Sequence, residues 1–220
     1  MIPQRHWQHR GKTLDVTTEL LPSASRLEQL AIPDAEVYSL RHLPLGETPE
    51  TVLSRLIGGI PWRAEKIVVW GKTFPQPRLI AWYGDASKNY TYSGLCWTPL
   101  PWTPELLDIK GSVETVTGTT FNSVLLNYYR DQRDSMGFHS DDERELGEQP
   151  TIASVSLGAE RTFILKHRTR KDLKPVRLRL GSGSLLLMTG ATQCHWKHAV
   201  NKESRPCGPR VNLTFRQILT

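Results

Sequence analysis

One stretch near the carboxyl end decides the fold: Arg210-Val211-Asn212-Leu213-Thr214-Phe215-Arg216. Apolar and polar side chains alternate here without a break, which predicts a β-strand with two unlike faces. On pattern alone, the polar face would simply meet water. If the sheet is closed, however, two arginines point into its interior, which is costly unless an anion meets them. A dicarboxylate ligand would satisfy both guanidinium groups through charge-assisted hydrogen bonds.

Short β-rich runs separated by Gly and Pro fill the chain around this strand. The predicted strands cover residues 121–129, 151–157, 162–166, 176–180, 184–188 and 210–218. Before them, Thr48-Pro49 and Thr103-Pro104 each provide a cap followed by proline in the first turn of a helix. The positions expected to face inward are Leu53, Leu56, Ile57 and Ile60 in the first helix and Leu106, Leu107, Ile109 and Val113 in the second.

This order of elements predicts an α+β protein whose sheet is closed or folded on itself, with helices packed on one side. The 220 residues fit one domain. The net charge of +6 favours a polyanionic partner over the alternative of ordinary basic solubility. Three widely spaced cysteines fit no disulfide framework and indicate a reducing compartment. With no apolar run of signal or membrane-spanning length, we expect a cytoplasmic protein with no membrane contact.

A candidate metal site begins at His139-Ser140-Asp141, because the two outer side chains share one face of an extended segment. His198 is the candidate for a third ligand, although spacing alone also allows His195. Two histidines and one carboxylate on one face of an octahedron leave three positions open, as in non-haem iron(II) oxygenases. The motif His-x-Asp is weak by itself, since it is often only a solvated pair.

One alternative metal site competes with this interpretation. A structural zinc site could instead use Cys194, His195, His198 and Cys207, all of which can bind zinc. Their spacing matches no common zinc module, and the site would leave His139, Asp141 and the arginine strand without explanation.

Several further runs accompany the candidate ligands. They read Asn127-Tyr128-Tyr129-Arg130-Asp131, Gly137-Phe138-His139-Ser140-Asp141-Asp142-Glu143, Ser154-Val155-Ser156-Leu157-Gly158, Arg161-Thr162-Phe163, His195-Trp196-Lys197-His198 and Pro209-Arg210-Val211-Asn212-Leu213-Thr214-Phe215-Arg216. Together, over residues 60–218, they resemble the AlkB family of Fe(II)- and 2-oxoglutarate-dependent nucleic-acid dealkylases. Within it they resemble most the branch of the human DNA repair homologues two and three.

The resemblance implies a double-stranded β-helix, or jelly-roll, core with helices on one side. Residues 1–45 are polar with only short apolar patches, which predicts a partly irregular lead-in, and they contribute nothing to the resemblance. The resemblance implies a dioxygenase domain over residues 46–220. Within this domain it places base-recognition hairpins at 62–98 and the catalytic core at 119–218.

The resemblance also implies a set of ligands: Fe(II), 2-oxoglutarate and dioxygen as the cofactor and co-substrates. His139, Asp141 and His198 would hold the iron, which leaves His195 a structural role. The residues implied to bind 2-oxoglutarate are Asn127, Tyr129, Arg210, Asn212 and Arg216. Independently, Asn127 and Tyr129 lie two apart on a predicted strand and so face the same way.

The implied activity is oxidative demethylation of 1-methyladenine and 3-methylcytosine in alkylated DNA, with RNA as a further substrate, by a monomer. Tyr90 and Tyr92 match positions that line the flipped base, and Trp70 matches the wedge that replaces it in the duplex. Asp142 and Glu143 would favour the positive charge of these bases, unless they are simply part of a solvated acidic loop. As plain sequence, Tyr90 and Tyr92 are equally typical of a half-buried strand.

A basic strip between Lys166 and Arg179 contains seven Lys or Arg against the single acid Asp172, which fits phosphate contacts or a solvated hairpin equally well. Two other functions remain open at this point. One is a 2-oxoglutarate oxygenase that acts on a protein or small molecule. The other is a basic nucleic-acid-binding protein with a structural metal.

Overall fold

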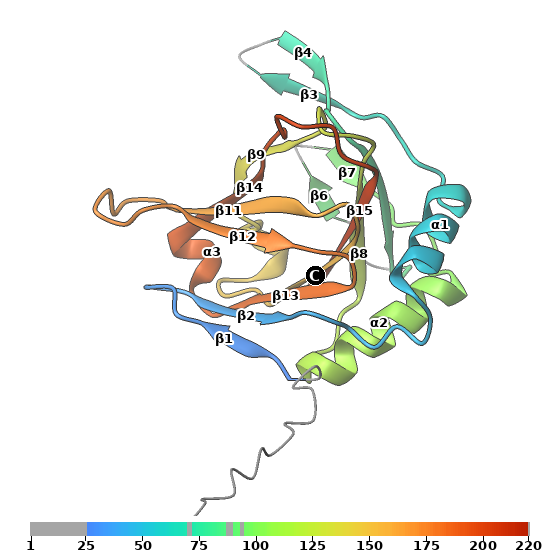
Figure 1. Ribbon diagram of the computed structural model, residues 1–220, viewed down its shortest axis with the longest axis horizontal. Helices are drawn as coiled ribbons and strands as arrows, with labels where there is room; N and C mark the ends of the chain where they lie inside the picture. Colours follow the sequence, from blue (N-terminus) through green and yellow to red (C-terminus); the bar gives the residue numbers. More distant parts are fainter. Residues whose placement is uncertain (1–25, 70–71, 87–89, 93–94, 220) are drawn as a thin grey trace, which may run out of the picture.

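The computed structural model describes residues 26–69, 72–86, 90–92 and 95–219. Two sheets dominate them, and every strand pairing within these sheets is antiparallel (Figure 1). In spatial order, the major sheet consists of β1 (Glu28–Leu30), β2 (Glu36–Leu40), β13 (Ser184–Thr189), β10 (Ile152–Gly158), β15 (Arg210–Arg216), β8 (Ser123–Tyr129) and β5 (Leu79–Gly84). The minor sheet consists of β12 (Val176–Leu180), β11 (Arg161–His167), β14 (Trp196–Val200) and β9 (Met136–His139).

Smaller elements complete the chain. Two separate hairpins are formed by β3 (Lys66–Val69) with β4 (Lys72–Pro75) and by β6 (Tyr90–Tyr92) with β7 (Leu95–Trp97). The helices are α1 (Pro49–Gly59), α2 (Pro104–Thr117), the short α3 (Thr192–His195) and a single 3₁₀ turn, η1 (Arg144–Leu146). No helix in the described part of the chain has the length and apolar character needed to cross a membrane.

Strand β15 separates two hydrophobic cores. Its apolar residues Val211, Leu213 and Phe215 are fully buried and belong to a core shared with α1 and α2. A second core, between the two sheets, includes Leu125 from the major sheet and Phe163 from the minor sheet. Both faces of β15 are therefore covered, which confirms the prediction that its polar residues point into the molecule.

The two long helices begin where the sequence predicted. The Thr48 Oγ accepts the N–H of Thr51 at 3.3 Å, and the Thr103 Oγ accepts the N–H of Leu106 at 3.3 Å. Helix α2 ends at Gly118, whose φ of 65° is a left-handed conformation that glycine adopts without strain. Leu107 is 47% exposed, so its predicted inward orientation is wrong.

Part of the segment predicted as a lead-in over residues 1–45 belongs to the major sheet. Strands β1 and β2 extend the major sheet beyond β13, and Val37 is fully buried. The three residues of β1 and the five of β2 show no regular alternation of apolar and polar side chains, which explains why the sequence showed only isolated apolar patches there. The sandwich of two sheets with α1 and α2 on one side nevertheless confirms the α+β class and the double-stranded β-helix core (Figure 1).

Candidate metal and co-substrate site

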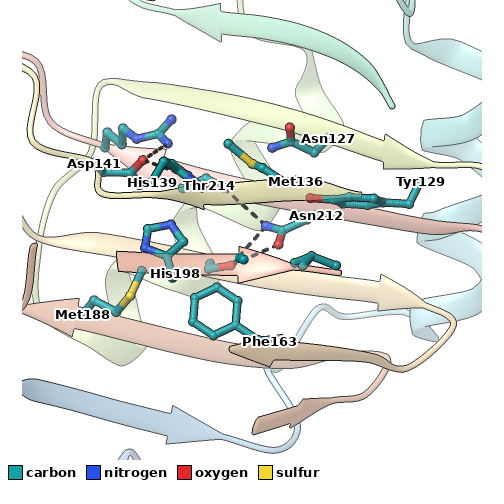
Figure 2. Close-up of a pocket in the computed structure, with 14 residues that line it drawn as sticks. Asn127, Tyr129, Met136, His139, Asp141, Phe163, Met188, His198, Asn212 and Thr214 are labelled. Carbon is teal, nitrogen blue, oxygen red and sulfur yellow. Dashed lines mark hydrogen bonds and ion pairs between the residues drawn. The ribbon is translucent and has the colours of Figure 1, made fainter. Parts of the chain in front are cut away.

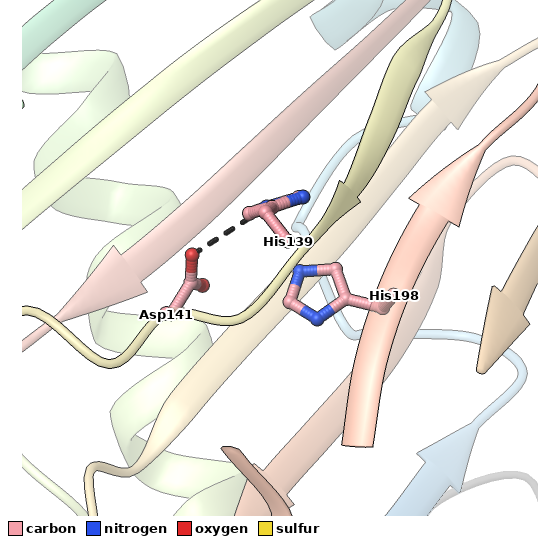
Figure 3. A group of neighbouring side chains, drawn as sticks. All are labelled: His139, Asp141 and His198. Carbon is pink, nitrogen blue, oxygen red and sulfur yellow. Dashed lines mark ion pairs between the residues drawn. The ribbon is translucent and has the colours of Figure 1, made fainter. Parts of the chain in front are cut away.

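The three predicted metal ligands come together between the sheets. His139 ends β9, Asp141 follows two residues later, and His198 lies in the middle of β14 directly opposite His139. Figure 3 shows the three side chains pointing toward one another, and one ligand atom from each lies within 4.8 Å of the others. The His139 Nε2 is 3.6 Å from the Asp141 Oδ1.

The electrostatics of the cluster suit a cation. Burial alone would raise the pKa of Asp141, but Arg216 and the two histidines outweigh burial and lower it from 3.8 to about 2. Burial, His139 and Arg216 lower the pKa of His198 from 6.5 to about 3, against the opposing effect of Asp141. At neutral pH the carboxylate is therefore ionised and the His198 ring is neutral, which are the forms that bind metals.

The donor set also fits a metal by its chemistry. Within the described residues, the Asp141 Oδ2 and the His198 Nδ1 are buried atoms without a hydrogen-bond partner. Buried polar atoms normally have partners, so such orphaned atoms indicate a ligand. Two imidazoles and one carboxylate can hold one face of an iron(II) ion and leave the other face open.

The alternative zinc site is not formed. Over the ranges that the structure describes, His139, Asp141 and His198 are the only group of three or more side chains placed to share a metal. Cys194 is exposed, with its Sγ 3.4 Å from the Glu148 carbonyl oxygen, and the His195 ring stacks on His167 at 5.8 Å. The structural role predicted for His195 agrees with this stacking.

A narrow pocket extends from the metal ligands along β8 and β15. Figure 2 shows Asn127, Tyr129, Asn212 and Thr214 lining it. The pocket also contains Arg216, so four of the five residues predicted to bind 2-oxoglutarate lie on its wall.

The fifth, Arg210, lies directly behind that wall. Its guanidinium carbon is 5.2 Å from the centre of the Tyr129 ring, and its Nη2 donates to the Asn212 Oδ1 at 2.8 Å and the Ser156 Oγ at 2.9 Å. The side chain is fully buried, and burial lowers its pKa. Its Nε and Nη1 have no hydrogen-bond partner within the described residues, so this cation is placed to receive an anion.

Arg216 differs from the sequence prediction in its contacts. Its Nη2 lies 2.9 Å from the Asp141 Oδ1, and both side chains are almost completely buried. The guanidinium therefore holds the metal-side carboxylate, in addition to any contact with 2-oxoglutarate.

Sequence reasoning missed several residues of the site, among them Arg78 and Ser154. Arg78 is 5% exposed and donates from Nε to the Asn127 Oδ1 at 2.7 Å, which fixes that amide. Ser154, on the pocket wall, forms a hydrogen bond with Asn212. Ser154 and Ser156 alternate with Val155 in β10, a pattern that sequence analysis used for β15 but not for this strand.

The predicted substrate residues are placed only in part. Asp142 is half exposed, and its carboxylate pairs with the Arg168 Nη1 at 2.7 Å. Glu143 is partly buried and immediately precedes η1. The backbones of Tyr90 and Tyr92 lie in β6, paired with β7. Trp70 lies outside the described residues. Because none of these observations shows a contact with a base, the roles of all five residues in substrate binding stay predictions.

The basic strip is partly neutralised by neighbouring acids. Arg168 pairs with Asp142, and Arg179 with Glu160. Arg170 pairs with both Asp172 and Asp34. Fewer of its seven cations are consequently available for phosphates than the sequence suggests.

A two-sheet barrel that holds two histidines and a carboxylate beside a buried arginine defines the class of non-haem iron oxygenases with an acidic co-substrate. Comparison with known families agrees: residues 42–216 match the model of the 2OG-Fe(II) oxygenase superfamily. The chain therefore belongs to this superfamily, and within it to the AlkB family, in the branch of homologues two and three.

Individual relatives support this assignment. The mouse protein named DNA oxidative demethylase ALKBH2 is 50% identical over 160 residues, which are 70% of this chain and 67% of that protein. The mouse protein named alpha-ketoglutarate-dependent dioxygenase alkB homolog 3 is 44% identical over 175 residues, 76% of this chain and 60% of that protein. The matched regions therefore span about 60 to 67% of the length of these relatives.

A solved structure described as that of OsALKBH1 shares the fold, with a TM-score of 0.60 at 18% identity over 87% of this chain and 99% of that chain. The superfamily's description states its metal and co-substrate, Fe(II) and 2-oxoglutarate. The prediction of Fe(II), 2-oxoglutarate and dioxygen is thus confirmed at the level of the family.

Proposed function

We propose that this chain is an Fe(II)- and 2-oxoglutarate-dependent oxidative demethylase of N-methylated bases in DNA, with RNA as a further substrate. The observation that carries the proposal is the convergence of His139, Asp141 and His198 at one end of a pocket whose wall continues toward Arg210. The names of the two mouse relatives support the reaction type, and ALKBH2 is named for its action on DNA.

Different residues of the site would bind the metal ion and the co-substrate. When bound, the iron supplies dioxygen chemistry in which 2-oxoglutarate becomes succinate and carbon dioxide and the methyl group leaves as formaldehyde. His139, Asp141 and His198 would hold the ion. Arg210, together with the amides of Asn127 and Asn212, would orient the diacid beside it.

Arg216 has a separate part to play. By pairing with Asp141, its guanidinium keeps the carboxylate ionised and pointed at the ligand cluster. We assign it this positioning role in addition to the predicted contact with 2-oxoglutarate.

Selection of the substrate rests on charge and on unstacking. The bases 1-methyladenine and 3-methylcytosine are cationic, so the carboxylates of Asp142 and Glu143, close to the metal ligands in sequence, would favour them over neutral bases. A base must leave the duplex to reach a buried metal, at a cost of a few kcal/mol that is smaller when methylation has already broken its pairing.

A turnover panel tests the proposal. Iron-loaded full-length chain is incubated with 1-methyladenine or 3-methylcytosine in single- and double-stranded DNA and RNA, and formaldehyde, succinate and oligonucleotide mass are measured. We expect demethylation that requires both Fe(II) and 2-oxoglutarate and falls below detection in His139→Ala. The matched control is His42→Ala, which changes an exposed histidine that does not line the pocket and should retain activity.

Two results would contradict the proposal. Absence of both products with every substrate would remove the enzyme function and favour a binding protein. Succinate that forms without change in any oligonucleotide would place the oxygenase on a protein or small-molecule substrate.

The predictions of a monomer and of a cytoplasmic location are retained as part of the proposal. Cys194 and Cys207 are free thiols, which supports a reducing compartment.

A further inference from the structure

Asp141 lies outside any helix or strand, so other contacts must hold it in place. Strand β9 ends at His139, so Ser140, Asp141 and Asp142 follow the strand in irregular backbone. A metal ligand on such a segment needs other contacts to stay in place, because a productive site tolerates errors of only about 0.5 Å.

Those contacts come from the segment that contains α3. The Ser140 Oγ donates to the Trp196 carbonyl oxygen at 3.0 Å, and the Asp141 N–H donates to the Gln193 Oε1 at 3.0 Å. Arg168 adds a bridge, since its Nη1 lies 2.7 Å from the Asp142 Oδ2 and 3.4 Å from the Gln193 carbonyl oxygen. Three consecutive residues around the ligand are thus fastened to residues 193–196.

Gln193 is the central member of this group. Its side chain is 1% exposed, so its amide depends on protein partners. The oxygen faces Asp141, since a backbone N–H requires an acceptor, and the Nε2 donates to the Met188 Sδ at 3.5 Å. Both ends of the amide are therefore fixed. Met188 itself lines the pocket beside His198 (Figure 2).

The same short segment also carries the third ligand. Helix α3 runs into β14, and His198 follows Gln193 by five positions in the sequence. One anchor at residue 193 consequently determines both where Asp141 lies and where β14 begins. Orienting groups behind metal ligands commonly contribute a factor of about 10 to 100 to metal affinity.

We propose that Gln193 is a positioning residue that sets the distance between Asp141 and His198, so that α3 acts as a clamp on the metal site. This inference rests on the proposed function, in which these two residues and His139 hold the metal ion. The essential feature is the acceptor oxygen of Gln193. A side chain of similar length without that oxygen leaves the Asp141 N–H unpaired and the carboxylate free to shift.

The test measures metal affinity directly. Mn(II) is titrated into the full chain without 2-oxoglutarate, and free Mn(II) is followed by electron paramagnetic resonance. We expect Gln193→Met to raise the Kd by about 10- to 100-fold. Gln193→Glu keeps the acceptor and should bind clearly more tightly than Gln193→Met. The control is Gln149→Met, the same chemical change at an exposed position, with an expected Kd equal to that of the unchanged chain.

The outcomes separate this inference from the proposed function. If His139→Ala abolishes Mn(II) binding while Gln193→Met leaves the Kd unchanged, the clamp is refuted and the metal site stands. If His139→Ala binds Mn(II) normally, the metal site itself is wrong. Should Gln193→Met fail to fold, Ser140→Ala removes a second bond of the same clamp, and an unchanged Kd there would equally refute it.

Discussion

At the scale of single residues, Arg210 offers a sharp test of co-substrate binding. We expect Arg210→Lys to raise the KM for 2-oxoglutarate by about 10- to 100-fold, since charge-assisted hydrogen bonds contribute about 1.5–3 kcal/mol. Lysine keeps the charge but cannot present two parallel donors to a carboxylate. Steady-state kinetics with varied 2-oxoglutarate measures the change, and the KM for the methylated oligonucleotide should stay constant.

Arg177→Lys is the matched control, because Arg177 is exposed on β12. An unchanged KM for 2-oxoglutarate in Arg210→Lys would assign the diacid to Arg216 alone.

The individual residues also show how far a sequence alone defines the site. His139 and Asp141 were found because their residue types and their relation to the arginine strand are unusual. The choice of His198 over His195 rested on the resemblance to the AlkB family. Arg78 and Gln193 were missed because each acts on a partner about 50 positions away, 49 for Asn127 and 52 for Asp141. Contacts of this kind leave no local period in the sequence, so only the fold shows them.

At the scale of elements, helix α2 allows a comparison within one turn. Leu106 is fully buried and Leu107 is 47% exposed, because adjacent residues differ by about 100° around a helix. We expect Leu106→Ala to lower the free energy of unfolding by about 2–5 kcal/mol. Leu107→Ala should change it by less than about 0.5 kcal/mol. Urea unfolding of the two variants measures both values, and equal losses would contradict the orientation of α2.

Whether a strand could be predicted from the sequence depended on whether its apolar and polar residues alternate. Strand β12 has the same bounds as its prediction, because Val176, Leu178 and Leu180 alternate with arginines. Strand β5 was missed although nearly all its residues are buried, since burial on both faces removes the alternation. Strands β9 and β14 were also missed, because their four and five residues show no regular alternation of apolar and polar side chains. Pairing between strands distant in the sequence, which defines these elements, has no local signature.

At the scale of the whole molecule, the site joins the two sheets. The metal ligands belong to the minor sheet and the loop after it, whereas Asn127, Asn212 and Arg216 belong to the major sheet. A metal ion and a diacid held by these residues would connect both layers and would bind only the folded chain. Binding is then linked to global unfolding.

This linkage leads to a measurable expectation. With Mn(II) and 2-oxoglutarate present without oxygen, each at about 100 times its Kd, each bound ligand should add about 2.7 kcal/mol to the free energy of unfolding. Urea titration with and without the ligands measures the difference. In His139→Ala the Mn(II)-dependent part should disappear, whereas His42→Ala, at an exposed position, should retain it. Stabilisation of the same size in His139→Ala would mean that the Mn(II) ion binds at a different site and does not connect the two sheets.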